Sequence, residues 1–359
     1  MSGDGRTDRP LPKFQAFFLT KQMKYNMNQW VAGLISGPGR SALPIVTSPG
    51  IPLIGAAPPD VFRSGVLQAE AVIALAAKTP QSAAALTMMD LSVEAEAFGT
   101  PIKFGAEENP TVLEGVVNEP AEIEKLPIPK IGFARTVETL RAAKLCAETI
   151  TDRPTLGGLI GPFSLAGRLT EMSKFMLWAA MDPTATHALL EKGTTFLIDY
   201  AKAFKAAGCN GIIMAEPAAG LISPKMSKEF SANYIKRVVD AVQDESFIFV
   251  LHNCGKTEKM VDVLLSTGAS ALHVGNAVDI RNILAQTPKH VPVMGNLDPA
   301  GIFRLGTTEI VYEAATALLE RTAEFPNFVL SSGCDIPPGT PLENVLAFFR
   351  ALDDWNTKR

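Results

Sequence analysis

The second half of the chain alternates short apolar segments with stretches of helical periodicity, and this alternation constrains the fold more than any other feature of the sequence. Residues 211–215 and 247–251 are continuous apolar segments within two predicted strands, and between them residues 224–242 carry an apolar side chain at every fourth position from Met226. Strands that are apolar without interruption and are separated by helices indicate a parallel sheet covered on both faces. The predicted fold class is therefore α/β.

Both halves together contain eight candidate strands. They are residues 43–46, 86–89, 155–160, 210–216, 247–252, 271–274, 291–295 and 328–332. Eight parallel strands are the number found in a (β/α)8, or TIM, barrel. The sequence therefore predicts a closed barrel, and an open doubly wound sheet stays as the alternative because the strand limits in the first half are poorly marked.

The length of 359 residues suits one barrel with added loops. We expect a single domain over residues 1–359, with the barrel formed by residues 41–359. Residues 1–40 are expected to form an N-terminal helical extension with a helix over 14–34. Residues 101–135 are rich in Pro and Glu and predict a long excursion, and excursions of this length often serve function.

Composition excludes several classes of protein. The net charge of −4, without a block of Lys or Arg, argues against nucleic acid as a partner. The apolar segments fall short of the roughly 20 residues of a membrane helix, and the polar N-terminus lacks the apolar stretch of a secretion signal. Four cysteines are too few for a disulfide scaffold of this size. We therefore expect a cytoplasmic protein with no membrane partner.

Three residues with metal-binding side chains follow predicted strands. His252 ends one strand, and Cys254 lies two residues further on, so extended backbone directs both side chains to the same side. Cys334 follows the last strand, and the carboxyl ends of barrel strands meet at one mouth, where active sites lie. Two thiolates and one imidazole favour zinc over magnesium or calcium, and three protein ligands leave one position open, as in catalytic zinc sites.

From the sequence alone, each of the candidate residues at the mouth has an alternative interpretation. Cys254 and Cys334 also fit a description as buried thiols without a metal. Glu216 ends a strand and is expected to act as a fourth ligand displaced by substrate or as a general base, unless its carboxylate only binds a loop. His273 is assigned a catalytic role in the same cavity, or else is a packed histidine. Gly255 would let the backbone turn tightly beside a ligand, as would Gly333.

Four further residues are expected at the mouth because they follow predicted strands. Asn296 is assigned a catalytic role, and Asp90 and Asp298 are assigned cofactor binding, although Asn and Asp in turns are commonly structural. Gly161 begins a Gly-Pro turn that would let a large flat ligand approach the backbone, and a simple tight turn is the plainer interpretation.

Taken together, these motifs resemble a known family. The segments 251–255 (LHNCG) and 332–345 (SGCDIPPGTPLENV) are similar to the zinc motifs of corrinoid-dependent methyltransferases in the uroporphyrinogen decarboxylase superfamily. Within it, the methylcobamide:coenzyme M methyltransferase type is the nearest in pattern. Further similar blocks occur at residues 89–99, 216–224 and 294–299, so the resemblance runs from about residue 40 to the C-terminus. Glu216 stands where the family often has Asp, and the arginine-containing N-terminal signature of true decarboxylases is missing.

The resemblance implies methyl transfer between a corrinoid, methylcobalamin in type, and a thiol activated on zinc. It implies that His252, Cys254 and Cys334 hold the metal, and that a partner corrinoid protein presents the cobalt centre over the mouth. The N-terminal helix and residues 101–135 are expected to help dock that partner. Coenzyme M, another thiol and a folate all remain possible acceptors. The alternatives are a decarboxylase-like lyase that acts on a tetrapyrrole through Asp90 or another carboxylate, and a barrel that binds a corrinoid without catalysis.

Overall fold

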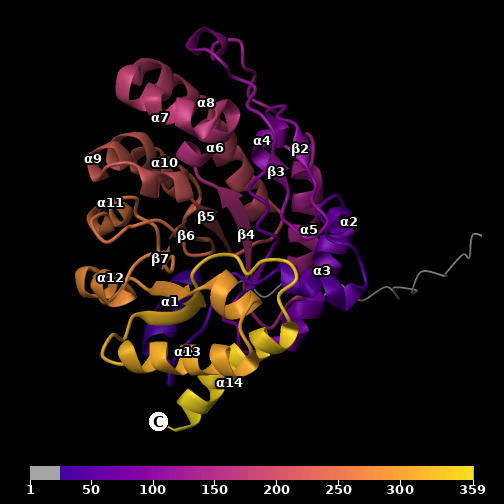
Figure 1. Cartoon of the computed structure of the whole chain (residues 1–359), viewed down its shortest axis with the longest axis vertical. Coiled ribbons are helices and arrows are strands. Elements are labelled where there is room, and N and C mark those ends of the chain that lie inside the picture. The colour runs from indigo at the N-terminus through magenta and orange to yellow at the C-terminus, as the bar shows by residue number, and fades with distance from the viewer. Residues whose placement is uncertain (1–24, 359) are drawn as a thin grey trace, which may run out of the picture.

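The computed structural model describes residues 25–358, and one parallel sheet of seven strands forms its centre. In sheet order the strands are β1 (Ala85–Leu86), β4 (Thr155–Ile160), β5 (Gly211–Ala215), β6 (Ile248–Asn253), β7 (Ala271–Val274), β8 (Val293–Leu297) and β9 (Phe328–Ser332). Each neighbour in this order is also the next strand of this sheet along the chain, and the sheet is curled (Figure 1).

Residues 41–46, which we call the closing segment, join the two edges of this sheet. Ala42 forms parallel bridges both with Leu330 of β9 and with Ser82, which precedes β1. The Leu43 N–H donates to the Leu330 carbonyl oxygen at 2.9 Å. The closing segment thus occupies the eighth strand position of a ring. The predicted (β/α)8 barrel is confirmed, and the open doubly wound sheet is excluded.

The predicted strands differ from the structure mainly in the first half. The prediction of a regular strand over 43–46 was wrong, because Pro44 has no N–H to donate and the closing segment makes only isolated bridges. The predicted strand 86–89 is reduced to β1, which pairs with β4 over two residues. In the second half, the predicted limits lie within two residues of those observed, because each of these strands is buried along its length.

Helices cover the outer face of the barrel (Figure 1). The longer ones are α3 (Gly65–Lys78), α5 (Thr136–Thr149), α6 (Pro162–Thr170), α7 (Met172–Met181), α8 (Pro183–Ala206), α10 (Asn233–Val242), α13 (Thr308–Arg321) and α14 (Leu342–Thr357). Shorter helices are α2 (Pro58–Val61), α4 (Val93–Ala97), α9 (Pro224–Ser227), α11 (Val261–Leu265) and α12 (Ile280–Gln286). Within residues 25–358, no helix combines the length and the apolar character that a membrane span requires.

The predicted helix over 224–242 contains a change of helical type. It begins with α9, where the Ser223 hydroxyl accepts from the Met226 N–H, and ends with α10. Between them lies a π-helical segment, η4 (Lys228–Ala232). Apolar side chains spaced four apart drift around an α-helix, which has 3.6 residues per turn, and a π turn absorbs extra length. The π segment therefore keeps this apolar stripe facing the core.

Helix α1 (Met27–Ser36) closes the end of the barrel opposite the strand C-termini. Its Met27 is fully buried in the same cluster as the inward-facing Ile248 and Val250 of β6. The Met27 N–H donates to the carbonyl oxygen of Glu245, which precedes β6. The first part of the predicted helix 14–34 lies outside the described residues. The closed end leaves the opposite mouth as the open face of the barrel.

The segment 101–135 leaves the barrel after α4 and returns at α5. It contains a short antiparallel pair, β2 (Ile102–Lys103) and β3 (Thr111–Val112), and a 3-10 turn, η2 (Pro120–Glu122). The N–H groups of Val116 and Val117 donate to the Leu169 carbonyl oxygen of α6 at 2.8 and 2.9 Å. The Lys192 ammonium of α8 donates to the backbone carbonyl oxygens of residues 124 and 126. Figure 1 shows this segment extending past α7 and α8.

Candidate metal centre

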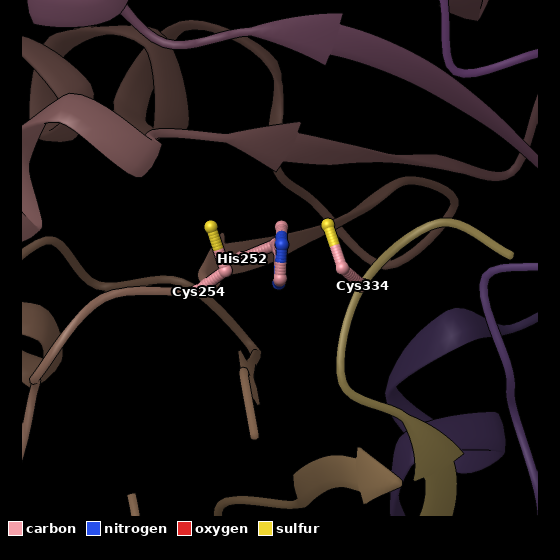
Figure 2. A group of neighbouring side chains, drawn as sticks. All are labelled: His252, Cys254 and Cys334. Carbon is pink, nitrogen blue, oxygen red and sulfur yellow. The ribbon is translucent and has the colours of Figure 1, made fainter. Parts of the chain in front are cut away.

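The side chains of His252, Cys254 and Cys334 meet at the mouth of the barrel. One ligand atom of each lies within 4.8 Å of the other two. Figure 2 shows the His252 ring, in this view, between the two sulfur atoms. His252 belongs to β6 and Cys254 follows it, whereas Cys334 follows β9. Two strands separate β6 from β9 in the sheet, and the curvature of the barrel brings their ends together.

Asn253 fixes the chain between the first two of these residues. Its side-chain NH2 donates to the Glu216 backbone carbonyl oxygen at the end of β5, at 2.8 Å. Its side-chain oxygen accepts from the Gly255 N–H, also at 2.8 Å. Because Asn253 is anchored on both sides, His252 and Cys254 are held in a fixed relation to the ends of β5 and β6.

Glycines around the site allow backbones to pack closely. A Cβ atom on Gly275 would lie 2.5 Å from the Cys254 Cα atom, and one on Gly333 would lie 2.7 Å from the Asn276 nitrogen. Gly255 packs in the same way against Gly220. Neither Gly255 nor Gly333 has a positive φ. The chain bends at both glycines, as expected, and the close approach of neighbouring backbone is a further reason for them.

A line of hydrogen-bonding groups lies behind His252. The Nδ1 atoms of His252 and His273 are 2.8 Å apart, and His273 Nε2 lies 2.8 Å from Ser331 Oγ. The Ser331 hydroxyl donates to the Leu43 carbonyl oxygen at 2.6 Å. All three side chains are buried. Burial, with His252 as a secondary cause, holds the pKa of His273 well below its usual range.

The other ring nitrogen of His252, Nε2, is suited to act as a metal ligand. His252 Nε2 is buried and has no hydrogen-bond partner among the described residues, and buried polar nitrogens are rarely left unpaired. Both cysteines are free and half-buried, so the sulfur side of the group is reachable from the mouth. One imidazole nitrogen and two sulfur atoms are the donor set of a zinc site.

The two thiols are electrostatically unequal. A hydrogen bond from Cys334 lowers the pKa of Cys254. The same contact with Cys254 raises the pKa of Cys334, and burial adds to the rise. One proton shared between two sulfur atoms accounts for both directions. A bound cation would take the place of this proton.

The Glu216 carboxylate binds the start of α6 and not the group of His252, Cys254 and Cys334. Its two carboxylate oxygens accept from the N–H groups of Phe163 and Ser164 at the start of α6, at 3.0 and 2.7 Å, and from the Ser164 hydroxyl. Burial raises the pKa of Glu216 to about 7 despite these donors. A Cβ atom on Gly161 would lie 2.2 Å from the Glu216 carboxylate, so Gly161 makes room for this side chain. In this structure Glu216 holds the start of α6.

The other predicted residues lie at the same end of the barrel with local partners. The side-chain NH2 of Asn296 donates to the carbonyl oxygens of Gly275 and Val278, both at 2.9 Å. Asp298 accepts from the N–H groups of residues 300 and 301 and so caps the π-helical turn η5 (Pro299–Arg304). Asp90 accepts from Ser92 and pairs with the Arg135 guanidinium.

Several polar residues at this end of the barrel were not predicted. Glu94 is buried, and burial raises its pKa to about 7. Arg135 also pairs with Glu96, at 2.5 Å. Asp335, next to Cys334, accepts from the Asn109 side chain at 3.2 Å. Of these, only Asp335 carried a sequence signal, because it adjoins a predicted ligand after a strand.

The sequence pattern of the uroporphyrinogen decarboxylase (URO-D) family matches residues 52–355. The chain belongs to the uroporphyrinogen decarboxylase family. The family membership that the motifs predicted is thereby confirmed.

Relatives within this family include methyltransferases and decarboxylases. The methylcobamide:CoM methyltransferase MtbA of Methanosarcina acetivorans is 32% identical over 261 residues, which are 71% of this chain and 75% of that protein. The methylcobamide:CoM methyltransferase MtaA of Methanosarcina barkeri is 27% identical over 310 residues, or 84% of this chain and 88% of that one. A uroporphyrinogen decarboxylase of Coxiella burnetii is 27% identical over 288 residues, or 77% and 78% of the two chains.

A solved structure shares the fold. A methyltransferase from Methanosarcina mazei superposes with a TM-score of 0.81 at 24% sequence identity, over 92% of this chain and 99% of that one. This similarity agrees with the barrel architecture described above.

Proposed function

We propose that this chain is a zinc-dependent methyltransferase that moves a methyl group between a corrinoid and a thiol. The observation that carries the proposal is the group of His252 Nε2, Cys254 and Cys334 at the mouth, with an unpaired buried imidazole nitrogen facing two sulfur atoms. Support for the corrinoid and the thiol comes from two relatives whose names specify methylcobamide and CoM.

His252, Cys254 and Cys334 would hold the metal. A bound zinc ion would lower the pKa of a thiol substrate placed at its open position, so that the sulfur is present as the nucleophilic thiolate. The two cysteine sulfurs would offset the charge of the metal, while burial of His252 keeps water away from the rear of the site. The half-exposed sulfur side would receive the substrate.

We assign Asn296 and Glu216 to the support of this site. Asn296 binds the loop that contains Gly275, and Gly275 packs directly against Cys254. The Glu216 carboxylate holds the start of α6 against β5. A role for Glu216 as fourth ligand or general base would require its carboxyl group to leave the N–H groups of α6.

The corrinoid would be presented by a partner protein, because side chains fill the interior of the barrel. We propose that the segment 101–135 contributes to docking this partner. Asn109 of this segment binds Asp335, the residue next to Cys334, so the segment reaches the rim of the site. Asp90, Gly161 and Asp298 lie at the same mouth, where they would contact the corrinoid.

The first test is the zinc content of the purified, reduced protein, measured beside Cys334→Ser. Cys146→Ala is the matched control, since Cys146 is buried in a different cluster. About one zinc per chain in the wild type and the control, and none in Cys334→Ser, would support the proposal and justify transfer assays with methylcobalamin and a panel of thiols. Wild-type protein that takes up no zinc when it is supplied would overturn it.

The second candidate is a decarboxylase that acts on a tetrapyrrole, which the relative from Coxiella burnetii supports. Asp90 would be its catalytic carboxylate, and in this structure Asp90 is bound by Arg135 and Ser92. Release of carbon dioxide from uroporphyrinogen by a zinc-free preparation would favour this candidate over methyl transfer.

A further inference from the structure

The hydrogen bonds behind His252 form a directed relay that ends on the backbone of the closing segment. In order, the groups are His252 Nδ1, His273 Nδ1 and Nε2, Ser331 Oγ and the Leu43 carbonyl oxygen, with successive distances of 2.8, 2.8 and 2.6 Å. Every side chain in the relay is at most 2% exposed. Water therefore has little access with which to complete or replace any of these bonds.

The direction of the relay follows from its last member. A carbonyl oxygen only accepts, so the single hydroxyl proton of Ser331 must point to Leu43 at 2.6 Å. If it pointed to His273 instead, two acceptor oxygens would face each other at that distance. Ser331 Oγ therefore accepts, and the nitrogen that donates to it is His273 Nε2.

The tautomer of each imidazole is then determined. A neutral His273 with its proton on Nε2 has a lone pair on Nδ1, which accepts from the His252 Nδ1–H. A neutral His252 that donates from Nδ1 has a bare Nε2, the nitrogen that lies near the two sulfur atoms and has no hydrogen-bond partner among the described residues. A doubly protonated His273 would instead bury a cation whose hydrogen-bond partners among residues 25–358 are a hydroxyl and another ring.

We propose that His273 and Ser331 are positioning residues that keep His252 in the tautomer and orientation that a metal requires. They act through His252 and do not touch the substrate. This rests on the proposed metal site, but not on the methyl-transfer reaction. The relay also spans the barrel interior from β6 through β7 to β9, so it couples His252 to the strand that precedes Cys334. For His273, this role replaces the catalytic one expected from the sequence.

The direct test is the tautomeric state of the histidines in the metal-free, reduced full-length protein. Two-bond 1H–15N spectra distinguish the two neutral tautomers and the cation, and the chain has only four histidines to assign. We expect the Nδ1–H tautomer for His252 and the Nε2–H tautomer for His273. A proton on His252 Nε2, or a cationic His273, would overturn the inference.

The second test is zinc affinity, measured by competition with a chromophoric chelator. Ser331→Ala removes the end of the relay, and loss of such an outer contact lowers metal affinity roughly 10- to 100-fold. Ser332→Ala is the matched control, because Ser332 is equally buried on the same strand and binds the closing segment through the Ile45 N–H, outside the relay. We expect its affinity to stay within about twofold of wild type, and Ser331→Thr, which keeps the hydroxyl, to retain most of the affinity.

Equal zinc affinities for Ser331→Ala and Ser332→Ala would refute the role of the relay. If either variant failed to fold, the tautomers of the wild type would still decide the question. Zinc binding with the expected tautomers but without methyl transfer would overturn only the proposed function. Transfer with zinc and the opposite tautomers would overturn only the relay.

Discussion

The close packing of Gly275 against Cys254 allows a quantitative prediction. In Gly275→Ala, the new Cβ atom would meet three backbone atoms of Cys254, with Cα at 2.5 Å, O at 2.8 Å and C at 2.9 Å. Ordinary contacts begin at 3.4 Å, so the Cys254 backbone must move by about 0.9 Å. This is several times the tolerance of about 0.2 Å in metal–ligand distances.

We therefore expect Gly275→Ala to lose at least roughly 10- to 100-fold in zinc affinity and about 1–3 kcal/mol in the free energy of unfolding. The first is measured by chelator competition, and the second by denaturant unfolding of the metal-free protein. Gly193→Ala in α8 is the control, because its Cβ atom would meet only Leu165 Cδ2, at 3.6 Å, and alanine stabilises a helix interior by about 0.5–1 kcal/mol. Wild-type zinc affinity in Gly275→Ala would refute the reasoning.

Three further predictions concern charge and metal binding. Glu94 has a folded-state pKa of about 7, raised by burial above the usual 4.5, so its stabilising contribution is full below about pH 4.5 and is lost as the pH rises through 7. Glu94→Gln should then gain on the order of 1–3 kcal/mol over wild type between pH 5 and pH 8 in denaturant unfolding, and a gap that does not change with pH would contradict this. Arg135→Ala leaves Asp90 buried without its partner and should cost about 3–5 kcal/mol, against about 0–1 kcal/mol for Arg141→Ala in an exposed pair; similar losses in unfolding experiments would argue against the buried pair. Zinc at a hundred times its Kd should stabilise the wild type by about 2.7 kcal/mol, seen as a rise in Tm, and an equal rise in Cys334→Ser would place the metal elsewhere.

The fold was predictable where local pattern and tertiary environment agree. The strands of the second half are buried along their length, and continuous apolar sequence is the direct signature of that burial. The closing segment is different, because Pro44 prevents a regular ladder and its bridges depend on partners remote in sequence. No pattern within residues 43–46 contains that information.

The residues of the site likewise divide into those that the sequence pattern predicted and those that only the fold reveals. The His252 and Cys254 pair was predictable from a spacing of two on a strand, and Cys334 from its place after the last strand. The contact of Glu216 with α6 depends on how a helix packs fifty residues away, and Ser331 is one of many serines in the chain. Only the three-dimensional structure identifies residues such as Ser331, because serine is common in the sequence and few serines lie beside the site.

The closure of the barrel also has a consequence for biosynthesis. The hydrogen bond between Ser331 and Leu43 joins residues 288 positions apart. At about 5–20 residues per second, a ribosome needs roughly 15 to 60 s to make the intervening chain. Throughout that interval the emerging N-terminal segment has no partner strand along one side, and His252 is translated before the strand that completes its surroundings. A nascent chain that stops before β9 therefore exposes an open seam to chaperones and proteases, and metal capture by all three ligands must wait until the last strand has left the ribosome.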